Sequence, residues 1–257
     1  LHSFPTRRSS DLRFPTLIAI AIIFYGGVKK GGFAAIIPVV VVTGIILIGI
    51  VMTLLMSKLL SKTVLKGLPS SFTLELPPYR KPQVGKIIVR SIFDRTLFVL
   101  GRAVSIAAPA GLIIWIMANV EVGQISILDQ CASFLEPFAH LIGMDGYILM
   151  AFILGFPANE IVLPIILMSY TSAGSILEYE SLAKLGGLLT SNGWTGLTAI
   201  CVMLFSLMHF PCGTTLWSIK KETGSMRWTV LSFVLPTVMG ITACLIVTGI
   251  FRLFGWA

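Results

Sequence analysis

Long stretches without a charged residue constrain this chain more than any other feature. They are rich in Ile, Leu, Val and Phe and cover residues 31–57, 103–120, 146–159, 161–177, 185–219 and 228–251. A helix that crosses a bilayer needs about 20 predominantly apolar residues. Overall, 56% of the residues are hydrophobic and 12% are charged, whereas a soluble domain carries about 25% charged residues. The sequence therefore predicts an integral membrane protein.

Continuous apolar stretches favour helices over a β-barrel. Barrel strands alternate apolar and polar residues, whereas these stretches stay apolar throughout. Backbone polar groups in lipid must find partners within the protein, and a helix provides them within one segment. Pro157, Pro164, Pro211 and Pro236 each remove a helix hydrogen bond and predict a kink or a break. We therefore expect an all-α fold, a polytopic transmembrane helical bundle with proline-broken or re-entrant helices.

Changes in composition divide the chain into four parts. Residues 1–12 have neither the apolar centre of a signal peptide nor a capped helix start, and we expect them to be a non-native leader. Residues 13–57 predict a transmembrane helical hairpin. Residues 58–102 are rich in Lys and Arg, which predicts a cytoplasmic segment by the positive-inside rule. Residues 103–257 form a second transmembrane domain.

A repeat of apolar residues in the basic segment predicts an interfacial amphipathic helix. Val84, Ile88 and Ile92 recur four residues apart, while Lys86 and Arg90 occupy another face. Such a helix lies along the lipid headgroups; the alternative is a solvated helix that leads into the next span. The formal net charge of +8 is concentrated in juxtamembrane segments, so it indicates membrane orientation and not nucleic-acid binding.

The charges that flank the apolar stretches predict that the chain turns back or breaks inside the membrane. After residue 120 the next charged residues are acidic, as expected for an extracytoplasmic loop. If every apolar stretch crossed once, Lys220 and Lys221 would lie outside the cell, against the positive-inside rule. We therefore expect one segment to be re-entrant or broken at mid-membrane, most plausibly around Pro211.

An acidic residue between two apolar stretches is the strongest candidate for function. Glu160 follows Pro157 closely and separates residues 146–159 from residues 161–177. An ionised Asp at a helix centre costs about 2.5–3.5 kcal/mol, and Glu is expected to be comparable. Glu160 is therefore expected to border an internal aqueous or metal-lined route. The structural alternative is that it reaches the interface or pairs with a basic group of another helix.

Residues 209–215 place an imidazole and a thiol three positions apart. His209 and Cys212 share a helix face if the helix continues past Pro211, and freed backbone carbonyls join them if it does not. Carboxylate, imidazole and thiolate are ligands for first-row transition metals, so Glu160, His209 and Cys212 form a candidate transient metal site. The alternative is that Cys212 packs as a small apolar residue and His209 bonds a nearby carbonyl.

Polar neighbours supply further oxygen atoms along the same path. They are Asn159, Thr214, Thr215 and Ser206. Ser and Thr also serve as helix-packing residues, and Cys201 and Cys244 are expected to be packing residues. The sequence contains no phosphate-binding loop and no motif of a serine hydrolase or a zinc protease. No catalytic residue is therefore predicted.

Several segments resemble the bacterial ferrous iron transport protein B (FeoB) family. They are GFPANEIV at 155–162, HFPCGTTLWSIKKETGS at 209–225 and ELPPYR at 75–80, and the similarity extends over residues 13–257. The resemblance implies the C-terminal part of that family's transmembrane region. Residues 13–57 would be the tail of a first gate-type repeat, and residues 103–257 a gate domain that forms the whole second gate.

The resemblance implies that the solute is Fe(II) and that the protein is a multi-pass transporter of the bacterial plasma (inner) membrane, not an enzyme. Cys212 matches the gate-motif cysteine and Glu160 the acidic residue of the other gate segment. With His209 and Asn159 they are the expected transient Fe(II) contacts. No tightly bound cofactor is expected, and GTP and Mg would act only through a GTP-binding domain upstream. The other expected partners are the lipid bilayer and a small FeoA-like accessory protein; a homo-oligomer remains open, and no nucleic acid is expected.

Three other functions compete with iron transport. A nucleoside-type solute carrier would need a polar pocket with aromatic stacking and no thiol. A gate-like structural or signalling membrane module would need no solute path. A membrane enzyme with Cys212 as nucleophile would need His209 within hydrogen-bond reach of the thiol, whereas a metal path requires Glu160 near His209 or Cys212.

Overall fold

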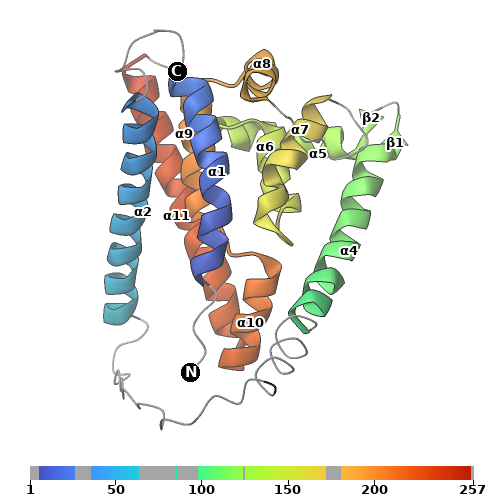
Figure 1. Ribbon diagram of the computed structural model, residues 1–257, viewed down its shortest axis with the longest axis vertical. Helices are drawn as coiled ribbons and strands as arrows, with labels where there is room; N and C mark the ends of the chain where they lie inside the picture. Colours follow the sequence, from blue (N-terminus) through green and yellow to red (C-terminus); the bar gives the residue numbers. More distant parts are fainter. Residues whose placement is uncertain are drawn as a thin grey trace.

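The computed structural model describes residues 6–26, 36–63, 85, 98–123, 125–171 and 181–255 (Figure 1). Its elements are α1 (Thr6–Tyr25), α2 (Ile36–Thr63), α4 (Phe98–Asn119), β1 (Glu121–Val122), β2 (Ile125–Ser126), α5 (Ile127–Leu141), α6 (Gly146–Leu154), the 3-10 turn η2 (Asn159–Ile161), α7 (Val162–Thr171), α8 (Leu182–Ser191), α9 (Gly196–Met208), α10 (Gly213–Thr223) and α11 (Met226–Leu253). Within these ranges the only strands are the two-residue pair β1 and β2. The predicted all-α fold is confirmed.

Three segments are long and apolar enough to cross a membrane. They are Ile36–Lys62 in α2, Gly196–Thr223 formed by α9 and α10, and Met226–Leu253 in α11, and the bent pair α5 and α6 would add a fourth if it counted as one span. Helices α1 and α4 also run along the height of the bundle (Figure 1). The chain is a multi-pass membrane protein, as predicted.

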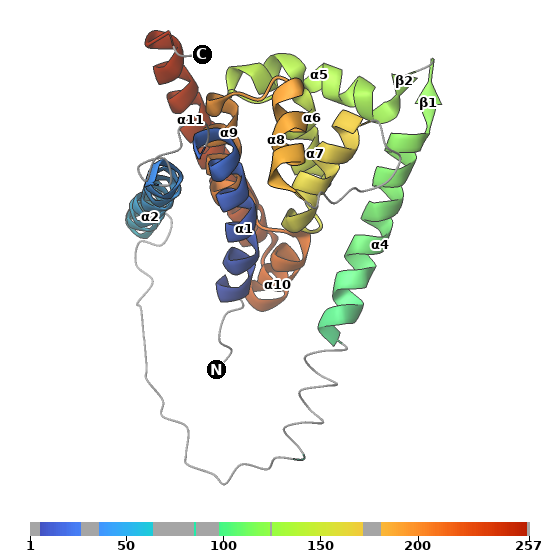
Figure 2. The same cartoon turned by 45° about the horizontal axis from the view of Figure 1, so that its top comes forward.

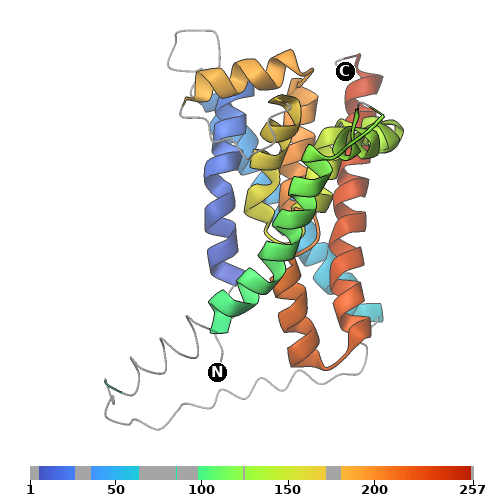
Figure 3. The same ribbon diagram turned by 90° about the vertical axis from the view of Figure 1, so that its right-hand side faces the viewer.

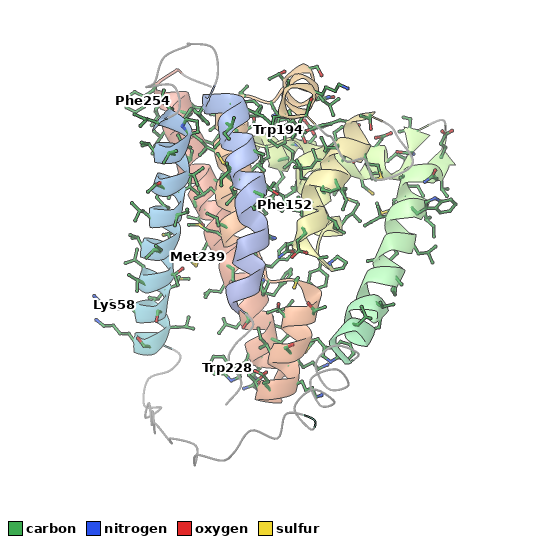
Figure 4. The ribbon with its side chains drawn as sticks, viewed as in Figure 1. Lys58, Phe152, Trp194, Trp228, Met239 and Phe254 are labelled. Carbon is green, nitrogen blue, oxygen red and sulfur yellow. The ribbon has the colours of Figure 1, made fainter. Side chains whose placement is uncertain are left out.

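The two ends of the bundle differ in their balance of charged residues. Lys58 lies at the lower end of α2 (Figure 4), and Lys220 and Lys221 lie in the last turn of α10 at the same end. Asp129 in the first turn of α5 and Asp145 at the start of α6 lie at the upper end. Lys184 of α8 and Arg252 of α11 also lie at the upper end. By the positive-inside rule, the acidic excess at the upper end and the lysines at the lower end favour the predicted orientation, with the lower end toward the cytoplasm.

Helices α6 and α7 form a re-entrant hairpin. The chain bends by 108° between α5 and α6, and α6 then descends from the upper end while α7 returns to it (Figures 1 and 2). With 9 and 10 residues, each arm is about 14–15 Å long at 1.5 Å per residue, against about 30 Å for the apolar core of a bilayer. Each arm alone is therefore too short to cross the membrane.

This hairpin corrects the predicted place of the re-entrant segment. Around Pro211 the chain breaks, as predicted, but α9 and α10 continue in one direction and cross the membrane as a single interrupted span. The turn back occurs at residues 146–171 instead, which returns Lys220 and Lys221 to the cytoplasmic end. The hairpin satisfies the charge rule because both of its arms are too short to span.

The prolines act according to their position in each helix. Pro157 lies in the turn after α6 and Pro211 between α9 and α10, so both mark breaks. Pro164 lies in the first turn of α7, where its missing N–H needs no helical partner. Pro236 lies inside α11, which continues past it as one helix, so no break occurs there.

Helix α9 forms the centre of the bundle. Its buried residues include Cys201, Met203, Leu204 and Phe205, and it contacts α1, α2 and α11. Helices α1 and α2 pack together. Figure 3 shows α4 crossing the bundle obliquely and α8 lying across its upper end. The predicted amphipathic helix lies outside the described residues apart from Gly85, and α1 begins at Thr6, within the predicted leader.

Candidate functional site

The turn between α6 and α7 contacts the break between α9 and α10. The backbone N–H of Gly213, at the start of α10, donates a 2.9 Å hydrogen bond to the carbonyl of Phe156, in the turn after α6. A Cβ on Gly155 would clash with Val162 and the carbonyl of Ala151, so this turn requires glycine. The segments that carry Glu160 and Cys212, 52 residues apart in sequence, therefore meet inside the bundle.

Aromatic rings pack around the junction of the two breaks. Phe152 of α6 makes edge contacts with Phe205 and His209, at centroid distances of 4.8 and 5.2 Å. Phe210 lies 5.8 Å from Phe156 and stacks on Phe233 of α11 at 4.9 Å. Aromatic pairs of this kind add about 0.5–1.5 kcal/mol each beyond their buried area. The rings pack the lower part of the hairpin against α9 and α11.

A small cavity lies beside Glu160. It has a volume of about 50 Å³ and is lined by Thr16, Leu17, Ile20, Phe152, Asn159, Glu160, Val162, Leu163, Ile166, Val202 and Ser206. A water molecule needs about 10–15 Å³ by this measure, so the cavity has room for about three waters. Asn159 Oδ1 is buried without a hydrogen-bond partner in the described part of the chain. Most of the lining is apolar, and Thr16, Asn159, Glu160 and Ser206 supply its polar groups.

Cys212 caps α10 with its thiol bonded to two hydroxyl groups. Its Sγ lies 3.1 Å from Thr214 Oγ1 and 3.2 Å from Thr215 Oγ1. Pro211 cannot donate a backbone hydrogen bond, so the chain leaves the helix before Cys212, and α10 starts at Gly213. The partial positive charge at a helix N-terminus and hydroxyl donors both favour an anionic sulfur. The predicted oxygen donors Thr214 and Thr215 therefore support the thiol.

His209 lies deep in the aromatic cluster. Its side chain is 5% exposed, and Nδ1 lies 3.0 Å from the carbonyl of Phe205 and 2.9 Å from that of Ser206. A ring nitrogen facing carbonyl oxygens must carry the proton and donate. The neutral ring then presents Nε2 as its remaining lone pair. His209 thus anchors the end of α9, as the structural alternative predicted for an imidazole in an apolar helix.

The Glu160 side chain is exposed, and the described residues form no salt bridge with it. A negative charge on Glu160 opposes a negative charge on the Cys212 sulfur. The same residues contain no group of three or more His, Cys, Asp and Glu side chains that could hold a metal ion. Glu160 and Cys212 lie on adjoining segments and do not form a complete metal cage.

Two family models match this sequence. Residues 42–94 match the C terminus of ferrous iron transport protein B, and residues 100–226 match the Gate domain, described as nucleoside recognition. The Fe(2+) transporter FeoB of Staphylococcus aureus (strain MSSA476) is 30% identical over 83% of this chain and 32% of its own length. The chain belongs to the FeoB family.

More distant FeoB relatives show the same coverage. The Fe(2+) transporter FeoB of Leptospira biflexa serovar Patoc is 25% identical over 81% of this chain and 32% of its own length. The chain thus spans about a third of the curated relatives it matches. No solved structure matches it. The α6–α7 hairpin with Glu160 and the broken span α9–α10 with Cys212 both fall inside the range that matches the Gate domain.

The structure brings most of the predicted site residues of this FeoB chain together. Asn159, Glu160 and Ser206 line the cavity, and Thr214 and Thr215 contact Cys212. Sequence reasoning missed Thr16 of α1, which lines the cavity opposite the hairpin. A polar residue directly after Pro15 in an otherwise apolar stretch was the available signal. Its place beside Glu160 depends on helix packing, which the sequence pattern does not reveal.

Proposed function

We propose that this chain forms part of an Fe(II) permeation path across the bacterial inner membrane. The junction between the α6–α7 turn and the break before α10 carries the proposal, because it brings the cavity lined by Asn159 and Glu160 next to the segment that carries Cys212. Broken helices expose polar groups at mid-membrane without exposing backbone to lipid. Such polar groups can replace the water ligands of a cation as it enters the membrane.

Glu160 and Cys212 are the proposed direct contacts of the ion. Asn159 contributes its unsatisfied Oδ1, and Ser206 borders the same cavity. Thr214 and Thr215 orient and polarise the thiol, while His209 holds the end of α9. Fewer than three charged ligands favour weak, successive binding, and an ion that is carried must also be released.

The expected roles of GTP, Mg and an accessory protein concern a protein longer than this chain. GTP and Mg would act through a GTP-binding domain in the part of the full-length protein that this chain does not include. A small FeoA-like accessory protein would be a further partner. Both proposals follow from the family and from the one-third share of the relatives that this chain covers.

The cavity does not favour the nucleoside alternative. Pockets for small organic ligands measure about 300–1,000 Å³, whereas the cavity beside Glu160 measures about 50 Å³. A pocket of about 340 Å³ lined by Tyr147 and Tyr170 lies at the upper end and shares no lining residue with that cavity. The enzyme alternative required His209 to activate Cys212, but the hydrogen bonds of this thiol go to Thr214 and Thr215. Transport therefore accounts for the site better than either alternative.

Uptake of Fe(II) by the full-length protein tests the proposal. Cys212→Ser and Glu160→Gln should each reduce uptake roughly tenfold, since changes around a metal ligand cost about ten- to a hundredfold in affinity. Cys131→Ser on α5 and Glu121→Gln on β1 are matched controls far from the junction and should transport normally. Normal uptake by both Cys212→Ser and Glu160→Gln would refute the site.

A further inference from the structure

A chain of hydrogen bonds crosses the extracytoplasmic end of the bundle. Asp145 Oδ1 accepts a 2.7 Å bond from the backbone N–H of Ile148, which caps α6. Its Oδ2 accepts a bond from the hydroxyl of Tyr170, near the end of α7. The same hydroxyl accepts a 2.8 Å bond from Nε1 of Trp194, just before α9. Figure 4 shows Trp194 near the upper end of the bundle.

A second set of contacts fixes the start of the hairpin to α5. Glu136 Oε2 accepts a 2.6 Å bond from the backbone N–H of Gly146. Gly146 lies so close to α5 that a Cβ would clash with the carbonyl of Ala132. Tyr147 donates a 3.0 Å bond to Asp129 Oδ1. These contacts hold α6 to α5, whereas the bonds of Tyr170 join α7 to α9.

Asp145, Tyr170 and Trp194 lie at the upper ends of α6, α7 and α9, and the lower ends of these helices lead to the candidate site. The hairpin begins at Gly146 and ends at Thr171, and its tip carries Asn159 and Glu160. Helix α9 begins at Gly196 and ends at Met208, where the break with Cys212 follows. Helices are stiff at this length, so a shift at the upper end moves the tip by a similar distance.

We propose that Asp145, Tyr170 and Trp194 form a positioning clasp that sets the depth of the hairpin against α9 and so holds Glu160 beside Cys212. The clasp rests on the proposed function for its role in transport. It borders a pocket of about 340 Å³ that is also lined by Ser133, Glu136, Tyr147 and Asn192.

The carboxylate of Asp145 acts in the clasp as an acceptor. Both of its oxygens already receive a hydrogen bond from the protein. The described residues provide no group of three metal-type side chains at this end. A positioning role therefore accounts for Asp145 with the contacts present, whereas ion capture would require breaking them.

Tyr170→Phe tests the clasp because it removes only the bridging hydroxyl and keeps the ring. In the full-length protein, this variant should lower the maximal rate of Fe(II) uptake severalfold and leave the half-saturating Fe(II) concentration unchanged. Tyr147→Phe is the matched control, because it also removes one tyrosine hydroxyl but leaves the link from α7 to α9 intact. A raised half-saturating concentration with an unchanged maximal rate would overturn the clasp in favour of a cation-collecting acid.

Cross-linking provides a readout that does not depend on transport. In a Glu160→Cys protein, a short bifunctional thiol reagent should join residue 160 to Cys212, and mass spectrometry of the joined peptides measures the yield. Adding Tyr170→Phe or Trp194→Phe should lower this yield severalfold while the thermal unfolding temperature stays near that of the parent. An unchanged yield in both would refute the clasp, even if Cys212→Ser had shown that the thiol is needed for uptake. A lowered yield would support it, even if Cys212→Ser transported normally.

Discussion

Two spans of almost equal length differ in nearly every other respect. Ile36–Lys62 in α2 has 27 residues and a mean hydropathy of 2.9, and 6% of its apolar 18-residue stretch is buried. Gly196–Thr223 in α9 and α10 has 28 residues and a mean hydropathy of 1.6, and 61% of the corresponding stretch is buried. The exposed span is one continuous helix, and the buried span is broken at its centre. Lipid tolerates only a closed hydrogen-bonded helix, while a protein interior can supply partners to a broken one.

The comparison locates function in the buried span. A break in a helix exposes polar groups of the backbone and side chains. Exposing them to lipid costs free energy, whereas beside a second break they can bind a solute. The bond from Gly213 to the carbonyl of Phe156 is the kind of partner that makes such a break tolerable. Substitutions in the two spans should therefore have different effects on stability and on transport.

Removing an aromatic ring from the buried span should have the largest effect on stability. Phe205 is 2% exposed and packs on Phe152, whereas Leu54 of α2 is 65% exposed. Phe205→Ala should lower the free energy of unfolding by about 3–5 kcal/mol because it leaves a cavity. Leu54→Ala should change it by less than about 0.5 kcal/mol. Equilibrium unfolding in detergent micelles measures both, and equal losses would contradict the difference between the spans.

Replacing a helix glycine by a larger residue should also have different effects on stability in the buried and the exposed parts of the bundle, with smaller free-energy changes. A Cβ on Gly240 of α11 would approach the ring of Phe205 to 3.0 Å, whereas a Cβ on Gly44 of α2 would meet nothing within 4 Å. Gly240→Leu should destabilise the protein by about 1–3 kcal/mol through overpacking. Gly44→Leu should be neutral or slightly stabilising in the same unfolding experiment, because helical Gly costs about 1 kcal/mol relative to ordinary residues. A destabilising Gly44→Leu would mean that α2 is covered by protein and not by lipid.

Restoring a hydrogen-bond donor at the break should affect transport more than stability. Pro211→Ala permits α9 to continue toward α10 and should move Cys212 away from Glu160. We expect Fe(II) uptake by the full-length protein to fall severalfold, with a change in the free energy of unfolding within about 1 kcal/mol. Pro236→Ala in the continuous helix α11 is the control and should transport normally. Unimpaired uptake by Pro211→Ala would show that proline does not set the geometry of the break.

The sequence predicted the membrane fold and the break at Pro211 because both follow from local chemistry. Long stretches without charge indicate helices that can lie in lipid, and each proline lacks a backbone N–H donor wherever it occurs. The positive-inside rule also required an additional turn or break in the membrane. The break was found at Pro211, but the turn back lies at residues 146–171, whereas residues 146–170 were interpreted as a segment that crosses the membrane. The arm length between Asp145 and Glu160 would have shown that α6 is too short to cross.

The contacts between elements could not be predicted from the pattern alone. Thr16 and Ser206 meet at the cavity only because α1 and α9 pack beside the hairpin. Tyr170 and Trp194 lie 24 residues apart, with no shared motif to indicate their hydrogen bond. Such pairings arise from packing, which the sequence encodes through side-chain shape and not through spacing.

Alkylation of Cys212 in the presence of Fe(II) tests most directly whether the two breaks form one ion-binding region. In the full-length protein under anaerobic, reducing conditions, Fe(II) should slow the reaction of this thiol with a maleimide, and Mg²⁺ at the same concentration should not. Glu160→Gln should abolish that protection, because the neighbouring carboxylate would no longer hold the ion. Equal rates of alkylation with and without Fe(II) in the unaltered protein would contradict a shared site at the junction.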